Sequence, residues 1–323
     1  MADQVSRSAQ TVFDALLRCR GEGMAGKAWR RLLRSVRARI ARRGDSLVLY
    51  RFEGQELLLP LSHDLPFYRQ EYPAYSANLA RLAAGLHARC PEMTFVDIGA
   101  NVGDTLVLLR SQAHFPVLCV EGCAPYAEVL RRNVQRSGAA DVEVAEVFVS
   151  AETGTVAGGI EASAGTARLV SGAPTECPSQ SLEDVLRAHP RFSSPRMVKL
   201  DTDGFDSLIL LGAKDLLARC LPLIFLEYDP YLFAQNGDDG LTLFRELREA
   251  GYGTALVYDN HGDLLLSAEL TNEALLEDLR DYYTGRCSQR YMDLCLFPER
   301  DRDLWTDLRR QELAFFRKLR GGG

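Results

Sequence analysis

The chain of 323 residues is 46% hydrophobic and 25% charged, and it carries a formal net charge of −6. These proportions are typical of a globular protein, and the negative charge gives no overall case for nucleic-acid binding. No apolar run reaches the length of a transmembrane helix, and the N-terminus has no signal-peptide core. The eight cysteines are scattered without Cys-x-x-Cys spacing, so we expect reduced thiols in a cytoplasmic protein.

The first 45 residues differ from the rest of the chain because they contain eleven Arg or Lys residues and only four acidic residues. We expect a short helix over residues 8–20 and a longer one over residues 27–43. Apolar side chains recur at helical spacing along the longer helix, at Trp29, Leu32, Leu33, Val36 and Ile40. This basic helix could contact a membrane surface or another anionic partner. It could instead pack on the main domain or on the second subunit of a homodimer.

Two short apolar runs, residues 46–52 and 55–60, flank Glu53-Gly54 and predict a β-hairpin. Residues 63–79 follow and are rich in Tyr, Pro and His, ahead of a helix expected over residues 76–89. Aromatic side chains and His63 on an irregular segment could line an acceptor pocket. The same segment could also serve only as a packed linker.

The apolar run from Thr94 to Ile98 predicts a buried parallel strand, and a glycine-containing turn leads from it into a helix over residues 104–112. Such a turn lets a ligand approach the backbone and the free N–H groups of the helix start. The turn has Gly99-x-x-x-Gly103 and lacks the middle glycine of a dinucleotide fingerprint. We therefore do not expect it to bind a pyrophosphate, and an NAD-dependent dehydrogenase is disfavoured.

Strands and helices alternate through the rest of the chain. A second strand, residues 116–121, ends on Glu121, an acid placed to accept bonds from ribose hydroxyls. Further strands are expected at residues 142–149, 196–200, 222–228, 252–258, 264–267 and 292–297. Helices are expected at residues 124–137, 206–218, 240–250, 272–283 and 300–320. This alternation predicts a parallel sheet with helices on both faces. Residues 150–180 are rich in small residues and predict mostly an exposed loop, with one or two short strands, that could flank the acceptor site. The segment could equally be a hairpin with no role in the site.

Five segments resemble class I S-adenosylmethionine-dependent methyltransferases, and among these the FkbM family. They are VDIGANVGDT (96–105), VEG (120–122), SLEDVL (181–186), VKLDTDGFDSLILLGA (198–213) and FLEYDP (225–230). The resemblance implies an α/β, Rossmann-like, doubly wound and mostly parallel seven-stranded sheet. It places an N-terminal helical and hairpin extension at residues 1–90, the S-adenosylmethionine-binding domain at 91–300, and a C-terminal helix and tail at 301–323.

The expected cofactor site lies at the carboxyl ends of the strands, where ligands of open α/β sheets bind. Glu121 is expected to hold the ribose, and Asp97 to face the ammonium group of the cofactor or to order the loop. Ser150 is a candidate near the adenine. The remaining cofactor candidates lie in the turn and at the helix start, at Gly99, Asn101, Gly103 and Asp104.

A hydroxyl acceptor needs a general base or a metal, because a neutral alcohol is a poor nucleophile. Asp201 is the expected base beside the transferred methyl group, with His261 and His63 as alternatives. Asp201 could instead hold the amino group of the cofactor. Asp201, Asp203 and Asp206, together with Glu227 as a further candidate, could also hold Mg²⁺ through oxygen ligands. The alternative for Asp203 and Asp206 is a turn followed by a helix cap.

The sequence therefore predicts an S-adenosylmethionine-dependent O-methyltransferase acting on a hydroxyl of a sugar, glycan or secondary metabolite. The acidic strand ends favour a neutral or cationic acceptor, and no nucleic-acid partner is expected. Two alternatives stay open. One is a nucleic-acid methyltransferase that grips phosphate through the basic N-terminal helix. The other is a non-catalytic scaffold with the same fold.

Overall fold

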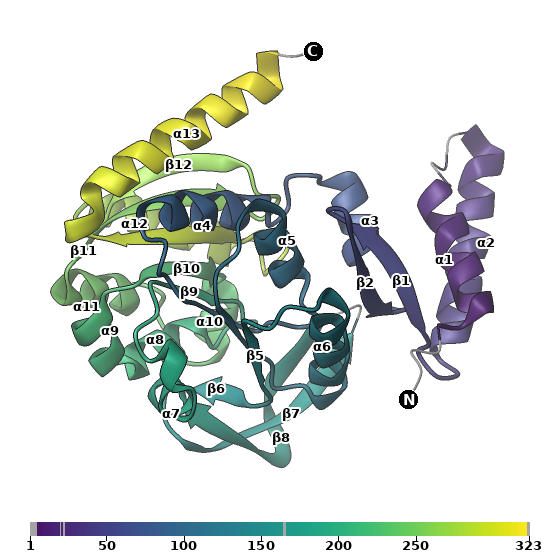
Figure 1. Cartoon of the computed structure of the whole chain (residues 1–323), viewed down its shortest axis with the longest axis horizontal. Coiled ribbons are helices and arrows are strands. Elements are labelled where there is room, and N and C mark those ends of the chain that lie inside the picture. Colours follow the sequence, from purple (N-terminus) through teal and green to yellow (C-terminus); the bar gives the residue numbers. More distant parts are fainter. Residues whose placement is uncertain (1–4, 20, 22, 164–165, 322–323) are drawn as a thin grey trace.

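The centre of the molecule is an eight-stranded mixed sheet with the strand order β12-β11-β13-β10-β9-β3-β4-β5 (Figure 1). The computed structural model describes residues 5–19, 21, 23–163 and 166–321. The strands are β3 (Phe95–Ile98), β4 (Val117–Val120), β5 (Val142–Ala145), β9 (Met197–Leu200), β10 (Leu223–Tyr228), β11 (Tyr252–Asp259), β12 (Leu264–Glu269) and β13 (Met292–Pro298). Strands β5, β4, β3, β9 and β10 pair in parallel, and β13, β11 and β12 extend the sheet by antiparallel pairs.

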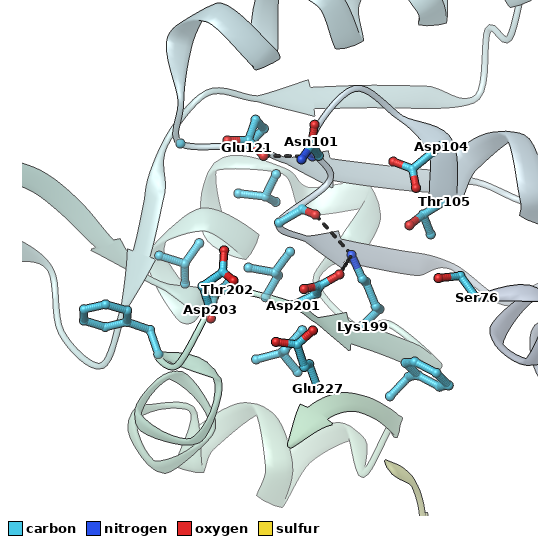
Figure 2. Close-up of a pocket in the computed structure, with 18 of the residues that line it drawn as sticks. Ser76, Asn101, Asp104, Thr105, Glu121, Lys199, Asp201, Thr202, Asp203 and Glu227 are labelled. Atoms are coloured by element: carbon cyan, nitrogen blue, oxygen red, sulfur yellow. Dashed lines mark hydrogen bonds and ion pairs between the residues drawn. The ribbon is translucent and has the colours of Figure 1, made fainter. Parts of the chain in front are cut away.

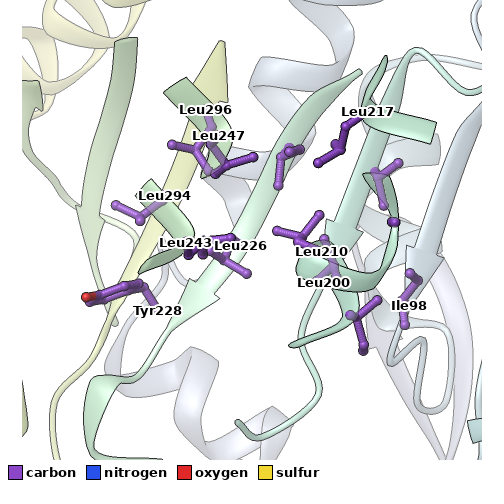
Figure 3. Close-up of a cluster of buried hydrophobic side chains, with 14 of the residues drawn as sticks. Ile98, Leu200, Leu210, Leu217, Leu226, Tyr228, Leu243, Leu247, Leu294 and Leu296 are labelled. Atoms are coloured by element: carbon purple, nitrogen blue, oxygen red, sulfur yellow. The ribbon is translucent and has the colours of Figure 1, made fainter. Parts of the chain in front are cut away.

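Successive residues of the buried strands point to opposite faces of this sheet, and each face is covered by helices. In β3, Val96 and Ile98 join the core on one face, whereas Phe95 joins the core on the other. The first face, part of which Figure 3 shows, is covered by α7 (Leu182–Ala188), α8 (Asp206–Gly212), α9 (Lys214–Cys220), α10 (Pro230–Gln235), α11 (Thr242–Ala250) and α12 (Glu273–Thr284). The second is covered by α4 (Ala77–Arg89), α5 (Asp104–Gln112), α6 (Ala124–Ser137) and α13 (Arg302–Gly321). The predicted doubly wound α/β fold is confirmed.

Three local predictions need correction. The sheet has eight strands where seven were expected, because β12 extends it at the edge beside β11. The expected strand 142–149 is two strands, β5 in the main sheet and β6 (Phe148–Ser150) in a second sheet. The expected helix 206–218 is broken at Ala213 into α8 and α9. Local apolar content does not reveal such breaks, because each half is as apolar as an unbroken element.

Of the two alternatives for residues 150–180, a loop or a hairpin, the structure shows mostly a long antiparallel hairpin of β7 (Gly154–Ser163) and β8 (Thr166–Ser181). It joins β6 in a three-stranded sheet with the order β6-β8-β7. Residues 164 and 165 of the predicted loop lie outside the described residues. The small side chains that suggested a loop are compatible with strand pairing, because the register is maintained by the backbone ladder.

The N-terminal extension contains α1 (Arg7–Arg18), α2 (Gly23–Ala41), the hairpin β1 (Leu47–Phe52) and β2 (Gln55–Pro60), and α3 (Leu65–Glu71). Glu53 and Gly54 form the hairpin turn with φ of 47° and 77°, values that a tight primed turn requires. Figure 1 shows the hairpin between the two N-terminal helices and the main body. The predicted hairpin is confirmed.

Two short 3₁₀ helices complete the described elements, η1 (Pro190–Phe192) and η2 (Glu299–Asp301). Helix α4 packs its buried leucines into the same core as β3 and α13. The division of the chain at residues 90 and 300 stays a prediction. Within the described ranges, every helix is too short or too polar to cross a membrane.

Candidate active site

A cavity of about 510 Å³ lies at the carboxyl ends of β3, β4, β9 and β10. Adjacent parallel strands end at the same edge of a sheet, so residues far apart in the sequence meet there. Eight of the predicted site residues line this cavity: His63, Gly99, Asn101, Asp104, Glu121, Ser150, Asp201 and Asp203. Figure 2 shows five of them, Asn101, Asp104, Glu121, Asp201 and Asp203. Four others, Asp97, Gly103, Asp206 and His261, are not part of its lining.

Gly99 is the point where the turn after β3 crosses the end of β9. Its φ is +79°, and a Cβ at this position would overlap the backbone carbonyl oxygen of Asp201. Only glycine accommodates both the left-handed conformation and this backbone contact. Gly103 also has a left-handed φ, +90°, but its missing side chain makes room for Leu130 of α6. Gly99 therefore shapes the cavity, whereas Gly103 permits the packing of α5 on α6.

We expect Gly99→Ala to destabilise the fold much more than Gly54→Ala. Gly54 has nearly the same φ, +77°, but nothing lies within 4 Å of its missing Cβ. The Gly54 variant therefore reports the backbone strain alone, about 1–2 kcal/mol, and the Gly99 variant adds the overlap with Asp201. Urea denaturation of both variants measures this difference. Equal losses of stability would contradict the close contact at Gly99.

Glu121 is buried at the end of β4, and both its carboxylate oxygens accept backbone hydrogen bonds. Asn101 N–H donates to Oε2 over 2.8 Å, and Cys123 N–H donates to Oε1 over 2.7 Å. Burial raises the pKa of Glu121, while these two bonds oppose the shift. Each carboxylate oxygen has a second lone-pair direction. The side chain is thus fixed in orientation and still able to accept hydrogen bonds from a ligand.

Lys199 is a functional candidate that the sequence analysis missed. Its Nζ lies 3.1 Å from Asp97 Oδ1 and 3.1 Å from Asp201 Oδ2, and it donates to the carbonyl of Gly99 over 3.1 Å (Figure 2). Burial alone would lower the pKa of Lys199, but the carboxylates of Asp201, Asp97 and Asp104 raise it well above its usual value. One feature of the sequence could have revealed Lys199: it is a charged residue inside an apolar strand, Met197–Leu200. A buried charge is stable only beside a partner of opposite charge.

Asp97 is fully buried beneath the turn. Burial raises its pKa, and Lys199 opposes this shift. Its side chain faces Lys199, and it is not among the residues that line the cavity. The pair connects β3 to β9 and holds the turn at Gly99 through the same ammonium group. Of the two roles predicted for Asp97, ordering the loop is the one its position supports.

Three carboxylates form a row across neighbouring strands, and one of them, Asp293, was not singled out from the sequence. Asp201 directly follows β9, Glu227 lies on β10, and Asp293 lies directly opposite Glu227 on β13. Burial and the charge of Asp201 raise the pKa of Glu227 well above its usual value and that of Asp293 to about 8. Asp293 is therefore mostly a protonated donor near neutral pH, and the raised pKa of Glu227 favours its protonated form in the same way.

The row of three carboxyl groups makes the free energy of unfolding depend on pH. A folded-state pKa raised from 3.8 to about 8 means that the folded protein binds the Asp293 proton more tightly than the unfolded chain. The stability due to this group is therefore lost as the pH rises from about 4 to about 8. We expect Asp293→Asn to reduce the loss of unfolding free energy between these pH values, as measured by urea denaturation. Parallel pH profiles for the two proteins would contradict the assignment.

The predicted Mg²⁺ site is not formed. Asp206 is fully buried, and its two oxygens accept backbone N–H groups of Thr202 and Gly204 over 2.9 and 3.2 Å. Burial raises its pKa to about 7. Asp203 has a φ of 52° in the turn. No group of three or more His, Cys, Asp or Glu side chains is arranged to hold a metal ion within the part of the chain that the structure describes. Of the predicted alternative, the turn is observed but the helix cap is not, because Asp206 is the first residue of α8 and accepts N–H groups of the preceding turn.

The two predicted histidines differ in their position. His63 lines the cavity, but its Nδ1 accepts the Leu65 N–H over 3.2 Å, so the neutral ring carries its proton on Nε2, 3.4 Å from Asn101 Oδ1. Burial lowers the pKa of His63 to about 4. His261 stacks on Tyr72 with ring centroids 3.8 Å apart and does not line the cavity. Neither arrangement leaves a ring nitrogen free to act as base in the cavity, which argues against both predictions.

Ser150 is buried in the cavity wall at the end of β6. Its hydroxyl contacts the carbonyl of Glu152 over 2.6 Å and the hydroxyl of Ser179 over 2.9 Å. It lies on the same side of the cavity as Phe148, whose ring occupies the space that a Cβ on Gly122 would need. Ser150 and the ring of Phe148 therefore line the same cavity, and a role of Ser150 near an adenine stays a prediction.

Comparison with known proteins agrees with this geometry. Residues 97–253 match the family model described as the Methyltransferase FkbM domain. No curated protein matches the chain significantly. The solved structures that resemble it include a methyltransferase FkbM from Methylobacillus flagellatus KT, with 17% identity over 50% of this chain and 39% of that one and a TM-score of 0.38. The chain thus spans well under half of that protein.

Two other solved structures show a similar level of resemblance. A precorrin-6y C5,15-methyltransferase from Geobacter metallireducens has 13% identity over 68% of this chain and 87% of that one, with a TM-score of 0.37. An O-methyltransferase from Bacillus cereus in complex with SAH has 14% identity over 57% and 73%, with a TM-score of 0.34. The similarity to this family depends on the match to the family model. Residues 97–253, just under half of the chain, resemble the FkbM methyltransferase domain.

Proposed function

We propose that this protein is an S-adenosylmethionine-dependent O-methyltransferase whose acceptor is a hydroxyl of a sugar, glycan or secondary metabolite. The observation that carries the proposal is the Glu121 carboxylate, held by two backbone N–H groups at the end of β4 and facing the cavity. A carboxylate fixed at this place in an open α/β sheet is suited to the two hydroxyls of a ribose.

The residues present fit this cofactor. Gly99 leaves backbone accessible where a side chain would overlap Asp201, and Asp104 offers a carboxylate on the cavity wall for an ammonium group. When bound, S-adenosylmethionine supplies an electrophilic methyl group and its own leaving group. The protein then has to position the acceptor and remove its proton.

Asp201 is the best-placed group for this proton. Its side chain lines the cavity and is 41% exposed, and Lys199 Nζ lies 3.1 Å from its Oδ2. The pKa values of the other two carboxyl groups of the row are raised, that of Asp293 to about 8, which favours their protonated forms. In that form, Glu227 and Asp293 can donate hydrogen bonds to acceptor oxygens while Asp201 receives the proton. This arrangement supports a hydroxyl acceptor.

The charge of the cavity supports a neutral or cationic acceptor. Seven carboxyl side chains line it among the described residues, namely Asp64, Asp104, Glu121, Asp201, Asp203, Glu227 and Asp293, against a single lysine, Lys199. Acidic groups outnumber the lysine even when Glu227 and Asp293 are protonated. A polyanion such as nucleic acid would meet repulsion there. The alternative of a nucleic-acid methyltransferase is therefore less well supported.

The test is transfer of a labelled methyl group from S-adenosylmethionine to a panel of hydroxylated acceptors, each paired with its deoxy analogue. We expect transfer to the hydroxylated member alone, in the presence of Mg²⁺ and of chelator, and a kcat lowered about 100-fold or more in Asp201→Asn. The affinity of that variant for S-adenosylhomocysteine should be nearly unchanged. Transfer to amines or to nucleic acid would overturn the proposal.

A further inference from the structure

Helix α2 exposes large apolar side chains that no other described element covers. Trp29 is 53% exposed, Leu32 52% and Val36 37%, and we call these three residues the outer face of α2. They lie at i, i+3 and i+7 and so form one stripe. Met24, near the helix start, is 90% exposed. Only three other large apolar side chains are comparably exposed in the described part of the chain, Leu265, Tyr282 and Leu319, on three different elements.

Contacts along one edge of the apolar stripe fix the orientation of α2. Leu33 is buried, and Arg37 donates to the carbonyls of Leu61 and His63 over 2.6 and 3.0 Å and pairs with Asp64. The five apolar residues do form one stripe, since Leu33 lies one helical turn from Trp29. Leu33 and Ile40 are covered along this edge, and the outer face beside them stays exposed.

The helix is strongly cationic. Residues 23–41 contain six basic side chains and no acidic one, namely Lys27, Arg30, Arg31, Arg34, Arg37 and Arg39. Arg37 faces the body, whereas Lys27, Arg31, Arg34 and Arg39 are exposed. The long stems of these side chains let their charged ends reach past an apolar stripe. Any partner of this surface must therefore supply both an apolar environment and negative charge.

We propose that the outer face of α2 docks on an anionic lipid surface, with the helix lying in the plane of the headgroups. An amphipathic helix with aromatic and aliphatic residues on one side and Arg or Lys around them binds such interfaces. The positions of α1 and α2 at the edge of the molecule leave the outer face accessible (Figure 1).

Other partners fit the surface less well. A symmetric pair of α2 helices from two copies would place four exposed cationic side chains against four. A copy docking through another face would find no second apolar patch, because the other exposed large apolar residues of the described chain lie on three separate elements. Double-stranded nucleic acid would supply the charge, but its paired and stacked bases would leave Trp29 and Leu32 uncovered.

The test is sedimentation of the full chain with phosphatidylcholine vesicles, with and without phosphatidylglycerol. We expect binding that requires phosphatidylglycerol and weakens as salt is added. The double variant Trp29→Glu/Leu32→Glu should lower the vesicle affinity at least about tenfold. The double variant Arg31→Glu/Arg34→Glu should lower the vesicle affinity by a similar factor at low salt.

The matched controls are on α13, where Leu319, Arg317 and Lys318 are also exposed. Leu319→Glu and Arg317→Glu/Lys318→Glu should leave vesicle binding unchanged. In a Trp305→Phe protein, Trp29 is the remaining tryptophan, and its emission should shift to the blue on binding. Circular dichroism confirms that each variant is folded.

Three results would overturn the proposal. The first is sedimentation with neutral vesicles that equals sedimentation with anionic ones, and the second is an equal effect of the α2 and α13 variants. The third is a change of molar mass by light scattering in the α2 variants without any effect on vesicle binding, which would assign the outer face to a second copy of the chain.

Discussion

Glu121→Ala lowers the affinity for S-adenosylhomocysteine by about 100-fold or more in isothermal titration calorimetry. The reason is that two charge-assisted hydrogen bonds to a ribose are lost, which together contribute about 3 kcal/mol or more. Glu121 is suited to this role because Asn101 and Cys123 hold its carboxylate in one orientation before any ligand arrives. A group ordered in advance loses little entropy on binding.

The control for this experiment is Glu146→Ala. Glu146 lies near the same edge of the sheet but outside the cavity lining, where it pairs with Arg131 at 2.6 Å on the surface. Its loss should leave the affinity unchanged. Thermal unfolding of both variants separates a loss of binding from a loss of folded protein. If Glu121→Ala stays folded and binds as the unchanged protein does, Glu121 is not the ribose anchor.

Lys199→Met lowers the free energy of unfolding by about 3–5 kcal/mol, because it leaves the buried Asp97 without its cation. Asp97 has no exposed surface, and Lys199 also holds the carbonyl of Gly99. We therefore expect both a lower urea midpoint and a weaker affinity for S-adenosylhomocysteine, since the turn at Gly99 forms part of the cavity.

Two companion variants make this prediction specific. Lys214→Met removes an exposed ion pair with Glu246 at 2.9 Å and should cost less than about 1 kcal/mol. Adding Asp97→Asn to Lys199→Met removes the uncompensated charge, so the double variant should be more stable than Lys199→Met alone. A loss of stability no larger than that of Lys214→Met would show that the buried pair contributes little.

The sequence predicted those parts of the site in which a functional residue comes directly after the end of a strand. The strand–glycine–helix segment around Gly99 and the acid Glu121 lie within a few residues of the apolar runs that define β3 and β4. The spacing from strand to functional residue is set along the chain, so it can be read without knowing which strands are neighbours. For the same reason, the doubly wound order of helices and strands was predicted correctly.

The parts that the sequence could not provide depend on which strands pair and in which register. Asp293 faces Glu227 only because β13 inserts antiparallel between β10 and β11, and this pairing joins residues more than sixty positions apart. Lys199 reaches Asp97 only because β9 lies beside β3. Residue spacing carries no information on such contacts, whose energy depends on distance through space and on burial.

The sequence by itself predicted the resemblance to the FkbM family, the fold class and the side chain expected to hold the ribose, because each depends on residues close together in the chain. The tertiary structure decided the rest. It turned Asp206 toward backbone N–H groups instead of a metal and placed His261 outside the cavity. It also divided the apolar stripe of α2 between the core and the surface. These outcomes depend on the direction in which a side chain faces, and only its packed neighbours set that direction.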